Sequence, residues 1–314
     1  MQATYLSGLD GSFREVDQIS EGVWINLTDP SPAEIQSVSV SCGVDPDDLR
    51  AALDVEERSR ITAEEGYVLI LVDVPTTELR GEREWYVTIP LGIVITRQAI
   101  ITVCSQPSGV IAEFERGRLR DFRTFMKTRF TLQLLLRNAA SYMAALHGID
   151  KMIDKGAASL RRSTRNAELI EMMELEKSLV YINTSLVGNQ RVLERLVRTS
   201  AVKKYPEDDD LLEDTMIENE QAIEMAGIYS GILSGTMDAY ASIIANNQNA
   251  IMKTLALVTI VLSIPTMIFS AYGMNVDTDG MPFAGVWWGF AVVIGITFVI
   301  ALVVLLLFIR KKWF

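Results

Sequence analysis

Two long stretches without a charged side chain lie near the C-terminal end of the chain. The first runs from Thr254 to Tyr272 and the second from Gly280 to Ile309. Each reaches the roughly 20 residues that a helix needs to cross the hydrocarbon core of a bilayer. The pattern therefore predicts two transmembrane helices, at about 254–272 and 283–309, joined by a short loop at 273–282.

The charged residues that flank these stretches predict the orientation of the spans. Lys253 precedes the first span and a basic tail, residues 310–314, follows the second, whereas the loop carries only Asp277 and Asp279. By the positive-inside rule, both termini face the cytosol and the loop is external. The first 13 residues have neither the basic start nor the apolar core of a signal peptide. We therefore expect a multi-pass protein of the cytoplasmic membrane with a cytosolic N-terminal part.

The residues before the spans change from a mixed pattern to a helical one. Residues 1–121 combine β-rich runs with helical patterns after Asp29-Pro30 and Asp45-Pro46, which predicts an α/β domain. The β-rich runs are 23–27, 67–74, 85–95 and 99–103. Residues 122–205 are helical throughout, with one break around 155–166, and so predict an antiparallel helix pair.

A long stalk helix is expected to follow. Pro206 and the four acids after it are typical of a helix N-terminus, and no proline recurs until Pro265. One helix can therefore run over 206–272 and carry the first span directly. Gly227, Gly231 and Gly235 lie on one face of this helix, which lets another backbone approach closely. We expect that face to pack against the helix pair, and a hinge is the alternative.

Four hydroxyl side chains recur along one face of the first span. Their spacings are four, three and four residues, and they are Thr259, Ser263, Thr266 and Ser270. The same face continues through Met252 and Asn249 to Asp238. Hydroxyls in membrane helices often bond to their own backbone carbonyls or join helices. Four in register with Asn249 and Asp238 instead favour a face that lines a water path, which several copies of the chain would have to enclose.

The residues at the end of this stripe resemble a known family. Tyr272-Gly273-Met274-Asn275 is similar to the Gly-Met-Asn hallmark that follows the first span in the CorA family of magnesium transport proteins. The terminal Lys-Lys-Trp-Phe also resembles that family, and the likeness in architecture covers the whole chain. The resemblance implies a funnel-like homopentamer in the lipid bilayer, with five first-span helices around a pore for divalent cations.

The resemblance also implies roles for individual residues. Gly273, Met274 and Asn275 would form the external selectivity filter. Ser263 departs from the pattern, because some members of the family place a bulky methionine there as a hydrophobic constriction. Met252 and Leu255 would then have to supply the gate. The expected pore-lining set is Asp238, Asn249, Met252, Leu255, Thr259, Ser263, Thr266 and Ser270.

Feedback by cytosolic magnesium is a further implication of the resemblance. Asp214 lies 24 residues before Asp238, so on a straight helix it points roughly 120° away from the pore face, toward a neighbouring subunit. Its partner would come from the α/β domain, where Asp73 and Glu78 are both candidates. A bound dication would reverse the repulsion between these carboxylates and draw the subunits together.

The ion that the residues favour is magnesium. This small dication gives up its water reluctantly and is recognised through that water by oxygen groups, whereas softer metals favour Cys or His. The first span has neither, and His147 lies in the predicted helix pair. Related transporters of zinc, cobalt or nickel share the signature and remain an alternative. The resemblance implies no organic cofactor.

Composition bears on the remaining classes of function. Of 29 basic and 40 acidic residues, four basic and two acidic ones follow residue 250, so residues 1–250 carry a formal charge of −13. Such a domain attracts cations and repels nucleic acid. A membrane-anchored enzyme or a scaffold is a more remote alternative, since the chain has no phosphate-binding glycine loop and no nucleophile elbow. Cys42 and Cys104 are expected to be reduced thiols, and the basic run from Arg116 to Arg129 a solvated helix face.

Overall fold

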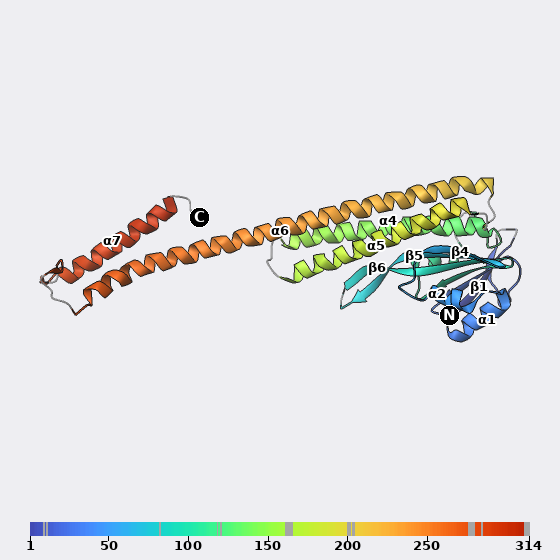
Figure 1. Ribbon diagram of the computed structural model, residues 1–314, viewed down its shortest axis with the longest axis horizontal. Helices are drawn as coiled ribbons and strands as arrows, with labels where there is room; N and C mark the ends of the chain where they lie inside the picture. The colour runs from blue at the N-terminus through green and yellow to red at the C-terminus, as the bar shows by residue number, and fades with distance from the viewer. Residues whose placement is uncertain are drawn as a thin grey trace. The chain divides into compact units, whose positions relative to one another are not determined.

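A computed structural model describes most of the 314-residue chain. The described residues are 1–8, 10, 12–81, 83–117, 119, 121–160, 166–199, 202, 205–275, 280–283 and 285–310. They form two compact units, Met1–Met237 and Asp238–Phe314. Figure 1 traces the elements along the chain in both units. The predicted tail beyond Arg310 lies outside the described residues, as do Asp277 and Asp279 of the predicted loop.

The N-terminal unit is built on one mixed sheet. Its strand order is β2-β1-β3-β7-β6-β5-β4, and only β3 and β7 pair in parallel. The strands are β1 Gln2–Ser7, β2 Phe13–Glu15, β3 Val23–Thr28, β4 Arg60–Glu64, β5 Tyr67–Arg80, β6 Arg83–Thr96 and β7 Ala99–Cys104. The helices of the chain are α1 Pro32–Cys42, α2 Pro46–Ala51, α3 Gly109–Glu115, α4 Lys127–Leu160, α5 Asn166–Arg198, α6 Asp209–Tyr272 and α7 Gly289–Arg310, with a 3₁₀ turn at Pro206–Asp208.

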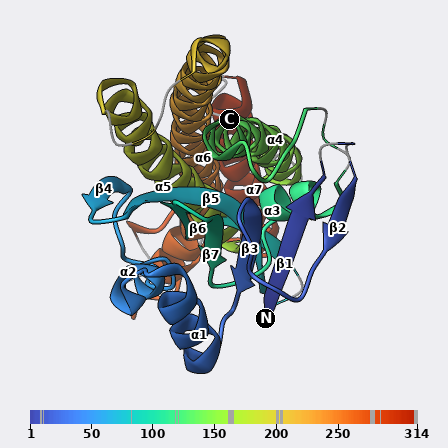
Figure 2. The same cartoon turned by 90° about the vertical axis from the view of Figure 1, so that its right-hand side faces the viewer.

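Helices cover both faces of this sheet, as Figure 2 shows, with α1 and α2 on one side and α4 and α5 on the other. Neighbouring side chains on a strand point to opposite faces, so Trp24 enters the core under α3 and α4 while Ile25 enters the core under α1. Strands covered on both faces read as continuous apolar runs. That pattern made β3, β5, β6 and β7 recognisable in the sequence.

The two short helices begin where the sequence predicted. The side chain of Ser31 accepts a hydrogen bond from the backbone of Glu34 and the Glu34 carboxylate accepts one from the backbone of Ser31, which forms a capping box for α1. Asp45 caps α2 in the same way by accepting from the amide of Asp47. The structure also contains β1, β2, β4 and α3, which the sequence did not predict.

Several predicted boundaries were wrong. The strand expected to end at Val74 continues to Arg80, because residues 75–80 pair with β6 in a long hairpin whose exposed end lacks an apolar run. Helix α4 starts at Lys127 rather than near 122 and continues to Leu160, so the break between the helices begins later than expected. Residues 161–165 lie outside the described part of the chain.

The basic run between Arg116 and Arg129 is not one helix face. Arg116 ends α3, whereas Lys127 and Arg129 lie in α4. The Nζ of Lys127 donates to the carbonyl oxygens of Thr96 and Arg97 at 2.8 and 2.6 Å, and Arg129 pairs with the buried Asp208 at 3.3 Å. Contacts with other elements therefore fix two of these basic side chains, those of Lys127 and Arg129. Arg118 and Arg120 are outside the described residues.

Helix α6 confirms the prediction of one continuous stalk helix. In the N-terminal unit, one face of α6 packs against the helix pair, where the amide of Asn219 donates to the Leu186 carbonyl at 3.2 Å and to Gln190 at 2.8 Å. Buried residues on this face recur every three or four positions: Thr215, Asn219, Ala222, Ala226, Tyr229 and Leu233.

The three stalk glycines lie away from that face. A Cβ added to Gly227, Gly231 or Gly235 would meet nothing within 4 Å. The expectation that they pack against the helix pair was therefore wrong, because the small side chains of Ala222 and Ala226 provide the close approach instead. Within one subunit the glycine face is open.

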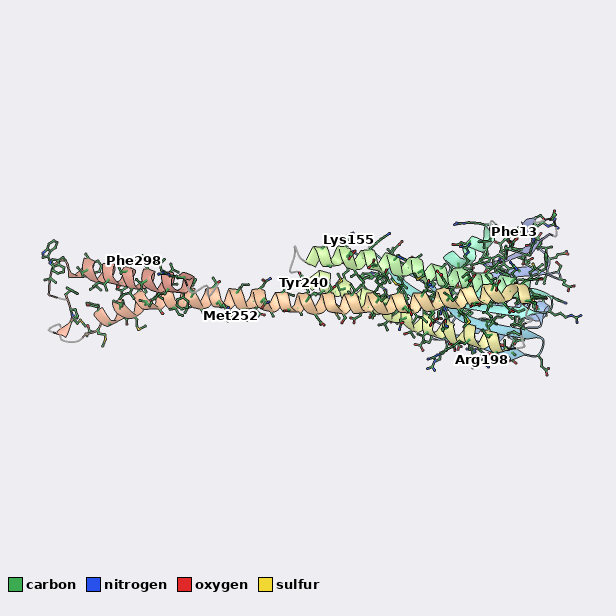
Figure 3. All side chains as sticks on the ribbon, turned by 90° about the horizontal axis from the view of Figure 1, so that it is seen from above. Phe13, Lys155, Arg198, Tyr240, Met252 and Phe298 are labelled. Atoms are coloured by element: carbon green, nitrogen blue, oxygen red, sulfur yellow. The ribbon has the colours of Figure 1, made fainter. Side chains whose placement is uncertain are left out.

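Among the described residues, two helices, α6 and α7, are long and apolar enough to cross a membrane. The second unit contains α7 and the part of α6 that follows Met237. They pack through Leu257 of α6 and through Thr297 and Ala301 of α7, all of which are buried. Figure 3 labels Met252 on α6 and Phe298 on α7. Helix α7 starts at Gly289 rather than near 283, because Phe283 has a left-handed φ of 63°, which a helix cannot contain.

Candidate ion pathway

The predicted polar stripe is one exposed face of α6 within the second unit. All eight expected pore-lining residues are exposed: Asp238, Asn249, Met252, Leu255, Thr259, Ser263, Thr266 and Ser270. Between Leu255 and Tyr272, the half-buried residues of the same helix are Val261, Ile264, Pro265 and Ile268, and three of them, Val261, Ile264 and Ile268, lie on the side of the buried Leu257 and thus toward α7. The hydroxyl stripe and α7 therefore occupy opposite sides of the first span.

Each of the first three hydroxyls donates its proton to the backbone of its own helix. Thr259 donates to the Leu255 carbonyl, Ser263 to that of Ile260 and Thr266 to that of Leu262, each at 2.9 Å. This is the back-bonding that often occurs in membrane helices. A hydroxyl oxygen has two lone pairs besides its proton, so each exposed oxygen can still accept a hydrogen bond from outside the helix.

The Gly-Met-Asn residues end α6 at the far end of the stripe. The amide of Gly273 donates to the carbonyls of Phe269 at 2.9 Å and Ser270 at 3.2 Å, and the amide of Met274 donates to Ala271. Met274 and Asn275 are exposed. The structure thus places the predicted filter directly after the last helical turn of the first span.

The hydroxyl of Tyr272 makes a contact that the sequence did not suggest. It donates to the carbonyl of Pro282 at 2.9 Å and so joins the end of α6 to the segment that leads into α7. Only the tyrosine itself, directly before the glycine, could have hinted at such a bond.

Asp73 lies between the sheet and the helix pair. Its amide donates to the side chain of Asn189 at 2.9 Å, and its carbonyl accepts from the side chains of Asn138 at 2.7 Å and Asn189 at 2.8 Å. Burial raises the pKa of the Asp73 carboxyl, and a hydrogen bond from Ser185 opposes that change. The two buried asparagines were missed in the sequence, although polar residues within the apolar stripes of two helices were a usable signal.

Glu78 and Asp214 have more open surroundings. Glu78 is exposed at the end of β5 and pairs with Arg80 at 2.8 Å, and Arg80 also pairs with Glu174 of α5 at 3.0 Å. Asp214 is exposed on α6. Among the described residues, no three or more His, Cys, Asp or Glu side chains form a group that could hold a metal ion. A single subunit therefore does not bring Asp214, Asp73 and Glu78 together.

The histidine and the cysteines lie apart from this pathway. His147 is exposed, and its Nδ1 lies 2.7 Å from the Met143 carbonyl one turn earlier in α4. Cys42 and Cys104 are both free thiols in the N-terminal unit.

Known proteins are similar to this chain over nearly its whole length. The family model for the CorA-like Mg²⁺ transporter protein matches residues 20–311. The cobalt/magnesium transport protein CorA of Methanocaldococcus jannaschii is 28% identical over 319 residues, covering 97% of both chains. The protein of the same description from Thermotoga maritima is 25% identical over 304 residues, which cover 94% of this chain and 84% of the relative. The complete structure of the CorA magnesium transporter from M. jannaschii has a TM-score of 0.85 at 26% identity and covers 100% of this chain and 99% of that one.

Together with an N-terminal α/β unit and two apolar helices, these matches over nearly the whole chain identify a membrane transport protein for divalent cations. The chain belongs to the CorA family of Mg²⁺ transport proteins.

Proposed function

We propose that this chain takes up magnesium across the cytoplasmic membrane as a homopentamer, with the hydroxyl stripe of α6 facing the common axis. The observation that supports this most directly is the position of the stripe. It is exposed on the side of α6 opposite α7 and leads to Gly273-Met274-Asn275. Five such faces around an axis would enclose a polar path, and the α7 helices would lie outside it toward lipid.

The hydrogen bonds of the stripe suit a hydrated cation. The water molecules around magnesium point their hydrogens outward, so the wall of the pore must supply acceptors. Because Thr259, Ser263 and Thr266 donate their own protons to backbone carbonyls, their outward oxygens act as acceptors. Neutral acceptors can hold a hydrated ion without trapping it, and magnesium dehydrates reluctantly.

Magnesium and cobalt are the two cations named in the descriptions of two relatives. The proteins of M. jannaschii and T. maritima are both described as cobalt/magnesium transport proteins. Residues 238–275 contain no Cys or His, so no thiolate or imidazole on the pathway selects cobalt, nickel or zinc over magnesium. Cobalt is therefore the second candidate ion, carried through the same oxygen-lined path.

Asn275 gives the sharpest test of the filter. Flux of magnesium into liposomes that contain the purified protein should be lost in Asn275→Ala, while the mass of the assembly stays that of five subunits. Asn247→Ala is a matched control, because Asn247 is also exposed on α6 but lies two residues before Asn249 and faces another side. Wild-type flux through a fully assembled Asn275→Ala protein would contradict the filter assignment.

An external blocker can test whether the filter recognises a hydrated ion or a bare one. A trivalent hexaammine complex resembles hydrated magnesium in size but does not shed its ligands readily. We expect it to block flux from the outside. Flux that continues unchanged would mean that the filter selects a dehydrated ion.

Topology and stoichiometry can be measured directly. Cysteines introduced near Asp279 should react with an impermeant reagent from outside, and cysteines near Phe314 only from the cytosolic side. A stable dimer with full transport activity would exclude the proposed pore. The same proposal makes the N-terminal α/β unit a regulatory rather than a catalytic part of the protein.

We infer that cytosolic magnesium closes the path by bridging Asp214 to Asp73 or Glu78 of a neighbouring subunit. The exposure of Asp214 and Glu78 makes both accessible to a second copy, whereas Asp73 lies deeper, next to Ser185 of α5. The absence of a three-ligand group among the described residues of one subunit agrees with a site shared between subunits.

A further inference from the structure

An apolar groove lies between the end of α6 and the start of α7 in the second unit. Its walls include Phe269, Tyr272, Phe283, Trp287, Phe290 and Val293. Every described residue that lines it is uncharged. Trp287 and Phe290 are 94% and 79% exposed, so they are rims of the groove and not part of a closed core. Among the described residues, the groove therefore offers apolar contacts and no charged side chain as a partner for an ionic headgroup.

The walls of this groove are held in place by specific contacts. The hydroxyl of Tyr272 donates to the Pro282 carbonyl at 2.9 Å, and the rings of Phe283 and Trp288 lie 5.9 Å apart. Gly289 lies against the backbone of Phe283, where a side chain would not fit. Because the turn is fixed in this way, the groove exists without an occupant.

The groove opens on the side of α6 away from the hydroxyl stripe. Tyr272 follows Ser270 by two residues, a rotation of about 200° on a helix, and so faces the opposite direction. If the stripe faces the axis of the assembly, as proposed above, the groove is turned away from the axis and toward the bilayer. Tyrosine and tryptophan at its rim are typical of the membrane interface. What covers the groove is then lipid.

We propose that this groove binds one acyl chain of a phospholipid, directly behind the filter residue Gly273, which forms part of its wall. In a bilayer, the attraction comes from close packing against the aromatic walls, because lipid tails are as apolar as the groove itself. The uncharged lining makes binding depend on the chain and not on the headgroup. This inference rests on the proposed function only for the direction in which the groove faces.

Two tryptophan substitutions on α7 test the site. Val293→Trp would fill the groove, whereas Val299→Trp changes an exposed valine that lies outside it on the same helix. The full-length protein would be purified in detergent, supplied with phosphatidylcholine or phosphatidylglycerol with identical chains, and weighed intact by native mass spectrometry. The wild type and Val299→Trp should retain lipid, and Val293→Trp should retain about fivefold less, equivalent to about 1 kcal/mol. Both headgroups should give the same result.

Three outcomes would overturn the proposal. Equal lipid retention in all three proteins would mean that no chain occupies the groove. Retention of phosphatidylglycerol alone would point to a headgroup site. Dissociation of the assembly by Val293→Trp but not by Val299→Trp would make the groove a contact between subunits. Lipid retention does not require transport, so a failure of magnesium flux in the wild type would refute the proposed function and leave this test valid.

Discussion

Alanine in place of Gly289 should disturb the end of the two spans that lies next to Gly273 and reduce transport. An added Cβ would overlap the carbonyl oxygen of Phe283 and lie 3.0 Å from its carbonyl carbon. Both are backbone atoms, so no side-chain rotation relieves the overlap. The turn from Phe283 to Gly289 would have to shift by an amount on the order of 1 Å, and overpacking of this kind costs about 1–3 kcal/mol.

The displaced turn is connected to the residues of the proposed filter. Pro282, next to Phe283, accepts the hydrogen bond of Tyr272, which immediately precedes Gly273. A shift of the turn therefore moves or breaks the contact that holds the end of α6. We expect magnesium flux into liposomes to fall about tenfold, the change in rate that corresponds to about 1.4 kcal/mol in the barrier.

Gly295 supplies the matched control on the same helix. A Cβ added there would meet nothing within 4 Å, so Gly295→Ala should transport like the wild type and unfold at the same or a higher temperature. Both variants would be compared by flux, by thermal unfolding and by the mass of the assembly. Wild-type flux and unfolding temperature in Gly289→Ala would refute the reasoning, because the overlap would then have no structural consequence.

Asp214→Lys should raise the internal magnesium concentration needed for half-inhibition by about tenfold, within the usual range of allosteric coupling, because it removes a carboxylate that would bind the closing ion and puts a positive charge in its place. Glu213→Lys, which faces a different direction, should not, and an unchanged inhibition curve for Asp214→Lys would remove its regulatory role. Because the pKa of Asp73 is raised, the folded state binds the proton of this carboxyl more tightly than the unfolded state does. The contribution of the protonated carboxyl to the free energy of unfolding is therefore present at low pH and is lost as pH rises through the folded pKa. Asp73→Asn should therefore raise the unfolding temperature more at about pH 7.5 than at about pH 4, near the ordinary aspartate pKa; an equal effect at both would contradict this sign. Thr102→Val removes the acceptor that the buried Trp24 indole uses at 2.8 Å, and denaturant unfolding should show a loss of about 1–3 kcal/mol; no loss would mean that the indole finds another partner.

The features that the sequence predicted well are those that depend only on residues within one segment of the chain. The uncharged runs up to Tyr272 and before Arg310 have the length of a membrane span, and the proline-free stretch from Asp209 allowed one continuous helix. The spacing of the hydroxyls placed them on one helix face without knowledge of any partner. Length and period depend only on neighbouring residues, so they could be read directly.

Features that depend on a partner from another helix or strand were missed or misplaced. The far half of β5, residues 75–80, is a strand because β6 pairs with it, and its own residues alternate too weakly to show this. Asp73 was one of two candidate partners of Asp214, and the sequence did not show that Asn138 and Asn189 from two different helices bind its backbone. The contacts of Asp73 join residues that are 65 and 116 positions apart.

The sequence by itself determined that this chain has two membrane-length helices, a single long stalk helix and a Gly-Met-Asn motif at the end of a polar stripe. Only the tertiary structure decided which faces of the long helix are covered. It showed that Ala222 and Ala226, and not the stalk glycines, meet the helix pair, and that α7 packs opposite the hydroxyl stripe. The physical reason is that periodicity defines the faces of a helix, whereas burial of a face requires a second surface, which the fold brings from another part of the chain.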